Sequence, residues 1–327
     1  MKPYFLLILT LLVGCSKSVP ASCDDASSSK CPPCPCATGG KSATGGKTSV
    51  GGSIAAGGKL ATGGSISTGG SASVVVVFPA CNSTTEHALK AANHRKHKLG
   101  GKAVNPRNEG VKATPPVVGA SVFWRSPCKA LDQDVSPYTG NPTGSCTGND
   151  ATQVSSTPPF SRTCAQADER AALLCYQDAT NIDNGCAWNA TNAQCPNDFT
   201  PQTDANDNGS YGQSAFDAAI RLGWFRGTRA VVQTLQGWHD ALLLGPCGFD
   251  QPWYNAGFAP TQCGSVALTG GLAGYHSTEM AGYDVPNQRM YGRNSWGEWG
   301  VEDGYFYYTF ANQRALLAAG AVMVLPT

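Results

Sequence analysis

The chain has 327 residues, of which 41% are hydrophobic and 14% charged, and its formal net charge is +1. This length suits one large domain or two ordinary domains, and the near-neutral charge argues against a dedicated nucleic-acid or anionic-lipid surface. We interpret the basic run HRKHKLGGK at 94–102 as a solvated surface segment. Fourteen cysteines are too many for a reducing cytosol, and their spacing does not resemble zinc-binding pairs. We therefore expect an exported, monomeric protein without nucleic-acid partner, metal or cofactor.

The N-terminus predicts export. Lys2 precedes the apolar run FLLILTLLVG, which is too short to span a bilayer but suits a signal-peptide core. The run ends in LVGC, which resembles the lipobox of bacterial lipoproteins, where the cysteine becomes the lipidated first residue. The resemblance implies a signal peptide over 1–15, a lipid anchor at Cys15 and, because Ser16 follows, a place at the bacterial cell surface or outer membrane. An ordinary cleavage site is the alternative.

Residues 16–74 are rich in cysteine, proline and glycine, and we predict a low-complexity linker. A glycine pair recurs at 39, 45, 51, 57, 63 and 69. A hexapeptide β-helix would need a large apolar residue in every repeat, which these repeats lack, so a flexible tether with a reach of about 30 Å is favoured. Residues 75–94 are interpreted as a linker or pro-segment-like region that begins with the strand-like run VVVVF, and residues 95–327 as the folded domain.

Helical patterns come first in this domain and strand patterns follow. Helix formers, apolar faces and glycine stops predict helices over 168–180, 212–223, 238–245 and 311–320. Short runs that are rich in aromatic residues predict strands over 276–284, 289–294 and 304–310. This order predicts an α+β fold in which two subdomains face each other.

One set of residues suits acyl transfer by cysteine, which needs a thiolate, a base and a group that orients the base. Cys146 follows a Gly-Ser turn and precedes residues that can open a helix. A helix N-terminus lowers the pKa of a thiol, and its unpaired amides can stabilise an oxyanion. His276 opens a strand-like run, and Asn294 opens NSWGEWGVEDGY, which is dense in tryptophan and glycine. A disulfide role for Cys146 is the alternative.

The stretches GYHSTEMAGYD at 274–284 and NSWGEWGVEDGYFYYTF at 294–310 resemble the His and Asn motifs of papain-like cysteine peptidases. The upstream LDQ…GSCTGNDA resembles the Gln and Cys segment of that family. Cys146 and His276 are 276 − 146 = 130 residues apart, within the range of about 130 to 150 for papain-type enzymes. The resemblance covers residues 95–325 and implies a papain-like fold, with a helical first half, an antiparallel β second half and the active-site cleft between them.

The resemblance also implies a role for each matching residue. Cys146 would be the nucleophile, His276 the general base and then acid, and Asn294 the group that orients the imidazole. Trp296 would shield the His–Asn hydrogen bond from water, and the Cys–His pair would be a thiolate and an imidazolium at neutral pH. Gln133 would contribute to the oxyanion hole, but it lies 146 − 133 = 13 residues before the cysteine instead of six. A loop must therefore bulge outward for Gln133 to reach the site.

Three classes of function fit these residues. The first is a surface-tethered cysteine peptidase that acts on protein or peptide substrates. The second is another cysteine acyl-transfer enzyme, an amidase or transpeptidase acting on cell-wall peptides. The third is an inactive binding lipoprotein on a peptidase fold, which the displaced Gln133 suggests. His239 beside Asp240 is a weaker candidate for a second histidine site, because a short amphipathic helix also explains it.

The remaining cysteines predict a disulfide framework. Without Cys15 and Cys146 there are 14 − 2 = 12 cysteines, an even number compatible with full pairing. Short separations favour the bridges Cys186–Cys195 and Cys247–Cys263. Three further cysteines, at 128, 164 and 175, are available to tie the first subdomain together.

Overall fold

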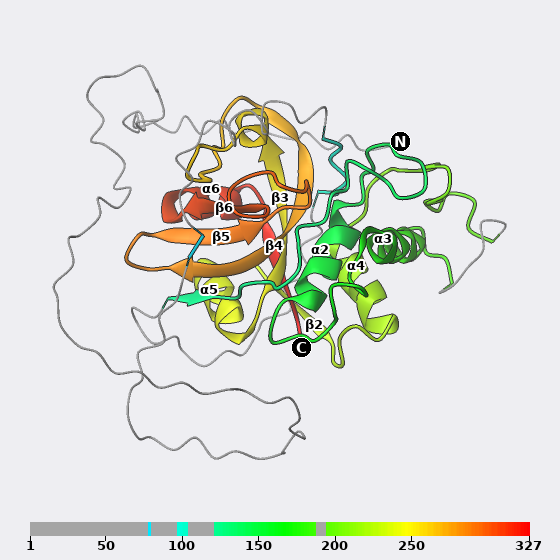
Figure 1. The fold of residues 1–327 in the computed structure, drawn as a ribbon, viewed down its shortest axis with the longest axis horizontal. Helices are drawn as coiled ribbons and strands as arrows, with labels where there is room; N and C mark the ends of the chain where they lie inside the picture. Colours follow the sequence, from blue (N-terminus) through cyan, green and yellow to red (C-terminus); the bar gives the residue numbers. More distant parts are fainter. Residues whose placement is uncertain (1–77, 80–96, 104–120, 188–193) are drawn as a thin grey trace, which may run out of the picture. The chain divides into compact units, whose positions relative to one another are not determined.

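The computed structural model describes residues 78–79, 97–103, 121–187 and 194–327 (Figure 1). Cys15, the signal peptide, the linker over 16–74 and nearly all of 75–94 lie outside these ranges. The elements in chain order are β1 (Val122–Phe123), α2 (Cys146–Ser156), α3 (Glu169–Asp183), α4 (Gly212–Arg221), β2 (Arg229–Val232), α5 (Leu235–Leu244), β3 (Cys247–Tyr254), the 3-10 helix η1 (Asn255–Phe258), β4 (Leu272–Asp284), β5 (Arg289–Arg293), β6 (Tyr305–Thr309), α6 (Phe310–Ala318) and β7 (Val322–Pro326).

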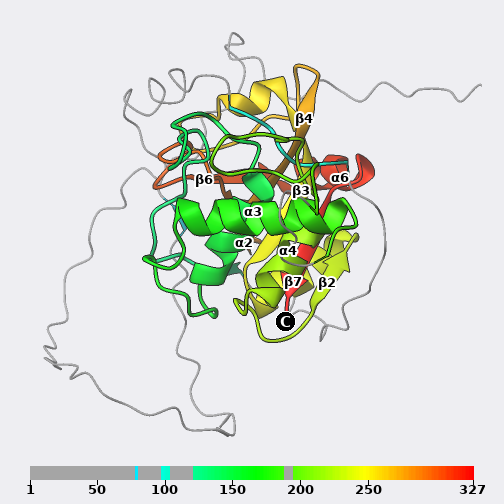
Figure 2. The ribbon, with the colours of Figure 1, turned by 90° about the vertical axis from the view of Figure 1, so that its right-hand side faces the viewer.

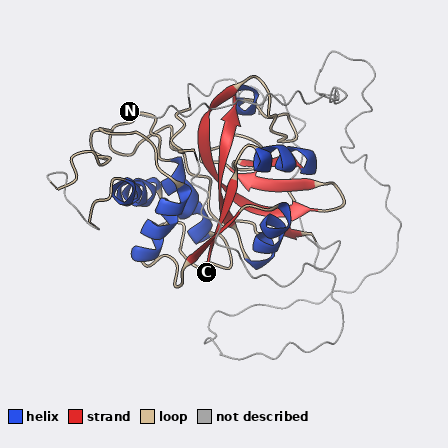
Figure 3. Ribbon diagram, turned by 180° about the vertical axis from the view of Figure 1, so that it is seen from behind, coloured by secondary structure: helices blue, strands red, loops and turns tan. Residues whose placement is uncertain are grey.

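Three helices form one half of the described domain, and an antiparallel sheet forms the other. The helices α2, α3 and α4 lie together beside the strands in Figure 3, and α3 is the outermost of the three in Figure 2. The sheet has the strand order β2-β7-β3-β4-β5-β6, and β1 pairs with β4. The predicted α+β fold, with a helical first half and an antiparallel second half, is confirmed.

Helix α2 is polar in sequence, yet every one of its residues is buried. Its hydroxyl groups bond back to the helix itself, for example Thr152 Oγ1 to the Gly148 carbonyl at 2.7 Å and Ser155 Oγ to the Thr152 carbonyl at 2.7 Å. A side chain at Gly148 would place Cβ 2.3 Å from the carbonyl oxygen of Ala172 in α3. Small self-bonded side chains and a glycine therefore let a polar helix occupy the centre of the helical half.

The sheet half has an aromatic core around its longest strand. β4 has 13 residues and pairs with β3 and β5. Trp238, Phe249, Trp253, Trp296 and Trp299 are buried in the same cluster. The predicted strand at 276–284 therefore forms, but it begins four residues earlier, at Leu272.

The disulfide prediction is correct in part. Cys186 is bonded to Cys195, and Cys128 is bonded to Cys164. The Cys247–Cys263 bridge is wrong, because Cys247 is a free buried thiol while Cys263 is disulfide-bonded elsewhere. Cys175 is also free and buried, so full pairing is wrong as well. Both thiols pack as small apolar side chains in the two hydrophobic cores.

Within the described ranges, no helix is both long and apolar enough to cross a membrane. The same residues contain no group of three or more His, Cys, Asp or Glu side chains placed to hold a metal ion.

Candidate active site

Cys146 is the first residue of α2, and its side chain is a free thiol that is fully buried. The backbone amides of Ser277 and Gly100 act on this thiol and lower its pKa, against the larger effect of burial. One turn further along α2, Asp150 Oδ2 accepts a hydrogen bond from Ser277 Oγ at 2.6 Å. The start of α2 is therefore held against the strand residue that follows His276.

His276 lies on β4 and Asn294 lies directly after β5, so the pairing of these two strands brings them together. His276 Nε2 and Asn294 Oδ1 are 2.8 Å apart, and both side chains are fully buried. Asn294 Oδ1 also accepts from the Ser295 amide at 2.8 Å, so the imidazole Nε2 is the donor in the His–Asn bond. Nδ1 of His276 has no hydrogen-bond partner among the described residues. This tautomer leaves Nδ1 as a proton acceptor.

Trp296 stacks on the imidazole of His276, with ring centroids 4.6 Å apart and an angle of 19° between the planes. Trp253 meets the same imidazole edge-on at 4.9 Å. Gly297 follows at a φ of 59°, where a Cβ would lie 3.0 Å from Asp132 Oδ2. Gly297 thus lets the backbone turn, and this turn places the Trp296 indole over the His276 imidazole. The indole excludes water from the imidazole.

Gln133 returns to the site despite its displacement in the sequence. The Thr143 amide donates to the Gln133 carbonyl at 2.9 Å, which closes the intervening residues 134–142 into a loop. The side-chain amide Nε2 of Gln133 donates to the Thr143 carbonyl at 3.0 Å and to the Lys98 carbonyl at 2.8 Å. Its Oε1 accepts from Ser295 Oγ at 2.7 Å. The excess residues therefore bulge outward and leave Gln133 beside the segment that leads into Cys146.

Residues 97–103, which we call the strap, lie across Cys146. The Gly101 amide donates to the Tyr275 carbonyl at 3.0 Å. On the other side, the Lys102 amide donates to the Ser210 carbonyl at 3.0 Å, and the Ser210 amide donates to the Gly100 carbonyl at 2.8 Å. The strap therefore joins the loop before α4 to β4 and covers the thiol.

The basic side chains of the strap meet acidic groups. His97 Nδ1 lies 2.6 Å from Asp134 Oδ2, and the His97 ring stacks on Trp296 with 3.9 Å between centroids. Lys98 Nζ lies 2.5 Å from Asp207 Oδ2. The interpretation of this basic run as a solvated surface segment is therefore wrong for His97 and for residues 99–102, which are buried or half-buried, whereas Lys98 is exposed. Two adjacent glycines within a basic run were the only sequence signal of this role.

Burial under the strap sets the protonation of the pair. Loss of water raises the pKa of the Cys146 thiol to about 12, although the amides of Ser277 and Gly100 act in the opposite direction. Loss of water lowers the pKa of His276 to about 4, against the opposing hydrogen bond to Asn294. Both shifts favour the neutral forms of the two groups while the strap covers them, and the thiolate–imidazolium pair stays a prediction.

His239 serves packing. Its Nε2 lies 3.1 Å from Gln313 Oε1, and its ring stacks on Tyr283 with 4.6 Å between centroids. These contacts hold α5 against its neighbours, as the amphipathic-helix interpretation of this histidine requires.

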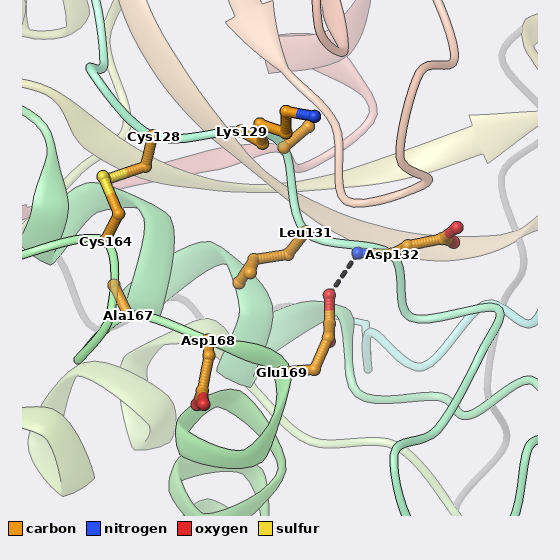
Figure 4. Close-up of a pocket in the computed structure, with 9 residues that line it drawn as sticks. Cys128, Lys129, Leu131, Asp132, Cys164, Ala167, Asp168 and Glu169 are labelled. Atoms are coloured by element: carbon orange, nitrogen blue, oxygen red, sulfur yellow. Dashed lines mark hydrogen bonds between the residues drawn. A yellow bond between two sulfur atoms is a disulfide. The ribbon is translucent and has the colours of Figure 1, made fainter.

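A separate pocket of about 380 Å³ lies beside the Cys128–Cys164 disulfide (Figure 4). The Asp132 amide donates to the Glu169 carboxylate there, and burial raises the pKa of Glu169 to about 7. None of the three predicted catalytic residues lines this pocket.

No protein-family model matches the chain, and no curated protein matches it by sequence. Several solved structures that it is similar to are cysteine proteases. One is xylellain from Xylella fastidiosa, at 17% identity over 71% of this chain and 98% of that chain, with a TM-score of 0.41. Another is the proform of the ragweed pollen allergen Amb a 11, at 16% identity over 75% and 74% of the two chains, with a TM-score of 0.38. A third is procathepsin L2 from the larval midgut of Tenebrio molitor, at 14% identity over 77% and 84%, with a TM-score of 0.38.

Proposed function

We propose that residues 95–327 form a papain-like cysteine peptidase domain that hydrolyses peptide bonds through Cys146, His276 and Asn294. One observation carries this proposal. Asn294 holds Nε2 of His276 and leaves Nδ1 without a partner among the described residues. The free, buried thiol of Cys146 opens α2, and Asp150 of that helix accepts from the hydroxyl of Ser277, the residue after His276. A thiol at a helix start, a proton acceptor and an orienting amide are the groups that cysteine acyl transfer needs.

These groups can carry out acyl transfer in two steps. His276 Nδ1 takes the thiol proton, and the Cys146 sulfur attacks the substrate carbonyl carbon. The Cys146 amide and Gln133 Nε2 stabilise the oxyanion. When the C–N bond breaks, the imidazolium gives its proton to the leaving amine, and an acyl-enzyme forms. Water, deprotonated by His276, then attacks the thioester and releases the carboxylic acid and the thiol.

The strapped form is a latent state in this proposal. The Lys98 carbonyl occupies the Gln133 Nε2 donor, and Gly100 lies against the backbone of Gly144, two residues before Cys146. The strap thus occupies both the oxyanion donor and the approach to the buried thiol. Turnover therefore requires displacement of the strap.

We further propose that the enzyme is lipid-anchored at Cys15 and displayed on the outer side of the membrane by the glycine-rich tether. The disulfides Cys128–Cys164 and Cys186–Cys195 support an oxidising compartment. Mass spectrometry of the mature N-terminus tests the anchor, and an unmodified terminus downstream of Cys15 would contradict it.

The test of the peptidase proposal compares purified wild-type protein with Cys146→Ala on unfolded protein substrates from pH 4 to 9. Cys175→Ala is the matched control, because it removes a free buried thiol that lies in the core of the helical half and donates to the Ala215 carbonyl of α4. Hydrolysis by the wild type and the control, and none by Cys146→Ala, is the expected result. Equal hydrolysis by all three proteins would exclude Cys146 as the nucleophile. Transfer of the acyl group to an added amine, with little hydrolysis, would favour the transpeptidase alternative.

A further inference from the structure

The side chain of Lys102 in the strap ends at a site built around Asp183, the last residue of α3. Lys102 Nζ lies 3.1 Å from Asp183 Oδ2 and 5.3 Å from the centroid of the Tyr211 ring. The Asp183 side chain is 3% exposed, and that of Lys102 is 31% exposed. The ammonium group thus reaches from the surface to a buried carboxylate and an aromatic face.

The carboxylate of Asp183 stands where a negative charge is unfavourable. The C-terminus of a helix carries a partial negative charge, and burial deprives the carboxylate of water. The hydroxyls of Ser210 and Ser214 donate to it at 2.9 and 2.5 Å, and the Tyr211 amide donates at 3.3 Å. These three donors are neutral, and a side-chain amide could accept the same bonds. The negative charge itself therefore indicates a cationic partner, the place that Lys102 takes.

The backbone on either side of this contact is held as an extended peptide ligand would be held. The Lys102 amide donates to the Ser210 carbonyl at 3.0 Å, and the Ser210 amide donates to the Gly100 carbonyl at 2.8 Å. The Gly101 amide donates to the Tyr275 carbonyl at 3.0 Å. Main-chain bonds of this kind give affinity for any extended peptide, whereas side-chain sites give specificity. The ion pair is therefore the contact that can select one side chain over another.

The ion pair lies close to the groups of the proposed reaction. The amide of Gly100 acts on the Cys146 thiol, and a Cβ at Gly101 would lie 2.9 Å from the backbone nitrogen of His276. The next residue of the strap is the one that reaches Asp183. An extended chain advances by about 3.3–3.6 Å per residue, so a peptide on the same path has a side chain at Asp183 within about two residues of the sulfur.

We propose that Asp183 is a specificity-determining residue, and that the peptidase prefers bonds with a lysine or arginine within about two residues. This inference rests on the proposed function and adds a class of substrate to it. In the strapped form, Lys102 occupies the place of the substrate's basic side chain. A basic substrate replaces one cation by another when it displaces the strap, whereas a neutral substrate leaves the carboxylate buried without a cation.

The first experiment maps by mass spectrometry the bonds that are cleaved in a reduced and alkylated protein substrate. The wild type should cleave bonds near lysine and arginine about tenfold more often than other bonds. Asp183→Asn, which keeps the acceptor and removes the charge, should lose this preference, and Asp183→Glu should keep part of it. Asp168→Asn is the matched control, because it removes a carboxylate at the other end of α3 and asparagine caps a helix equally well.

The possible outcomes separate this inference from the function on which it rests. Hydrolysis with the same distribution of cleaved bonds in the wild type and Asp183→Asn would overturn the role of Asp183 and leave the peptidase proposal standing. No hydrolysis by any of these proteins would contradict the peptidase proposal, and the substrate preference with it.

The second experiment needs no turnover and tests whether Asp183 recognises a cation. The rate of Cys146 alkylation by iodoacetamide is measured for Lys102→Met and Asp183→Asn, alone and combined. Each single change should speed alkylation by about fivefold, because the strap loses its ion pair. The combined change should be no faster than either alone, and Lys102→Arg should keep the wild-type rate. Two effects that multiply in the combined variant, or wild-type rates in both single variants, would overturn the recognition of the cation by Asp183.

Discussion

Gly100→Ala is the sharpest test of the strapped form. The added methyl group would lie 1.5 Å from the carbonyl oxygen of Gly144 and 2.2 Å from its carbonyl carbon. Gly144 is itself held in place, because its amide donates to Asp207 Oδ2 at 2.7 Å. Neither backbone can move aside, so the strap must leave.

The free energies involved are large enough to measure. Four hydrogen bonds hold backbone atoms of the strap, namely Gly101–Tyr275, Lys102–Ser210, Ser210–Gly100 and Gln133–Lys98. At about 0.5–1.5 kcal/mol net for each bond, they contribute roughly 2–6 kcal/mol to the strapped form. Overpacking by one methylene costs about 1–3 kcal/mol even where neighbours can adjust. A shift of about 3 kcal/mol changes the open population by about a hundredfold.

The assay is alkylation of Cys146 by iodoacetamide at pH 8, followed by peptide mass mapping. Cys175 and Cys247 are buried and free, so they serve as internal references for general unfolding. Gly245→Ala is the matched control, because the nearest atoms to its Cβ lie 3.4 Å away and belong to a side chain. We expect about a hundredfold faster alkylation in Gly100→Ala and the wild-type rate in Gly245→Ala. Folded Gly100→Ala that reacts at the wild-type rate would refute the strap as the cover of Cys146.

Lowering the pH from 7 to 4 should release the strap, because the pKa of His276 is about 4 beneath it and returns toward about 6.5 in water. The strapped form binds fewer protons between these values, so its stability is present above pH 6.5 and falls by about 3 kcal/mol as the pH drops to 4. The rate at which Cys146 reacts with dithiodipyridine should therefore rise. A rate that stays constant would contradict this linkage. Asn294→Ala should lower kcat without abolishing it, since only the orientation of His276 is lost. A pH–rate profile with the same maximum as the wild type would exclude an orienting role for Asn294. Arg293→Ala should destabilise the fold by about 3–5 kcal/mol in urea unfolding, because Glu279, whose carboxylate lies 3.9 Å from the guanidinium, stays buried without its cation. Loss of less than about 1 kcal/mol would show that Glu279 accommodates burial by protonation.

The part of the site that the sequence predicts is the part built from neighbouring strands. His276 and Asn294 are 294 − 276 = 18 residues apart, and β4 and β5 between them form one antiparallel pair. Alternating side chains and a short connection are enough to bring two such residues together. The helices α3 to α6 were predicted nearly in place for a similar reason, since α4 and α5 carry local apolar periodicity and end at Arg221 and Leu244. The helix α2 was not among the predicted helices, because its buried residues are mostly polar and show no apolar periodicity.

The strap could not be predicted in this way, because its contacts are distant in sequence and involve backbone atoms. Gly101 pairs with Ser210 across 210 − 101 = 109 residues. A run of Lys, His and Gly has the composition of a solvated segment, and only the buried carboxylates of Asp183 and Asp207 show otherwise. The complete burial of Cys146, which favours the neutral thiol, could not be predicted for the same reason. The prediction of a Cys247–Cys263 bridge was wrong because a short separation in sequence does not reveal that Cys247 belongs to an apolar core.

The loop over 134–142 has a consequence for how this chain tolerates change in length. It leaves and re-enters the domain at a hydrogen-bonded pair, Gln133 and Thr143, and its own turn is closed by the Ser136 amide to the Asn141 carbonyl at 3.0 Å. Gly140, Asn141 and Pro142 are exposed. An inserted epitope or fluorophore-binding tag between Gly140 and Asn141 would extend only the tip, since longer loops cost little additional closure entropy. An insertion at this loop therefore leaves Gln133 in its place.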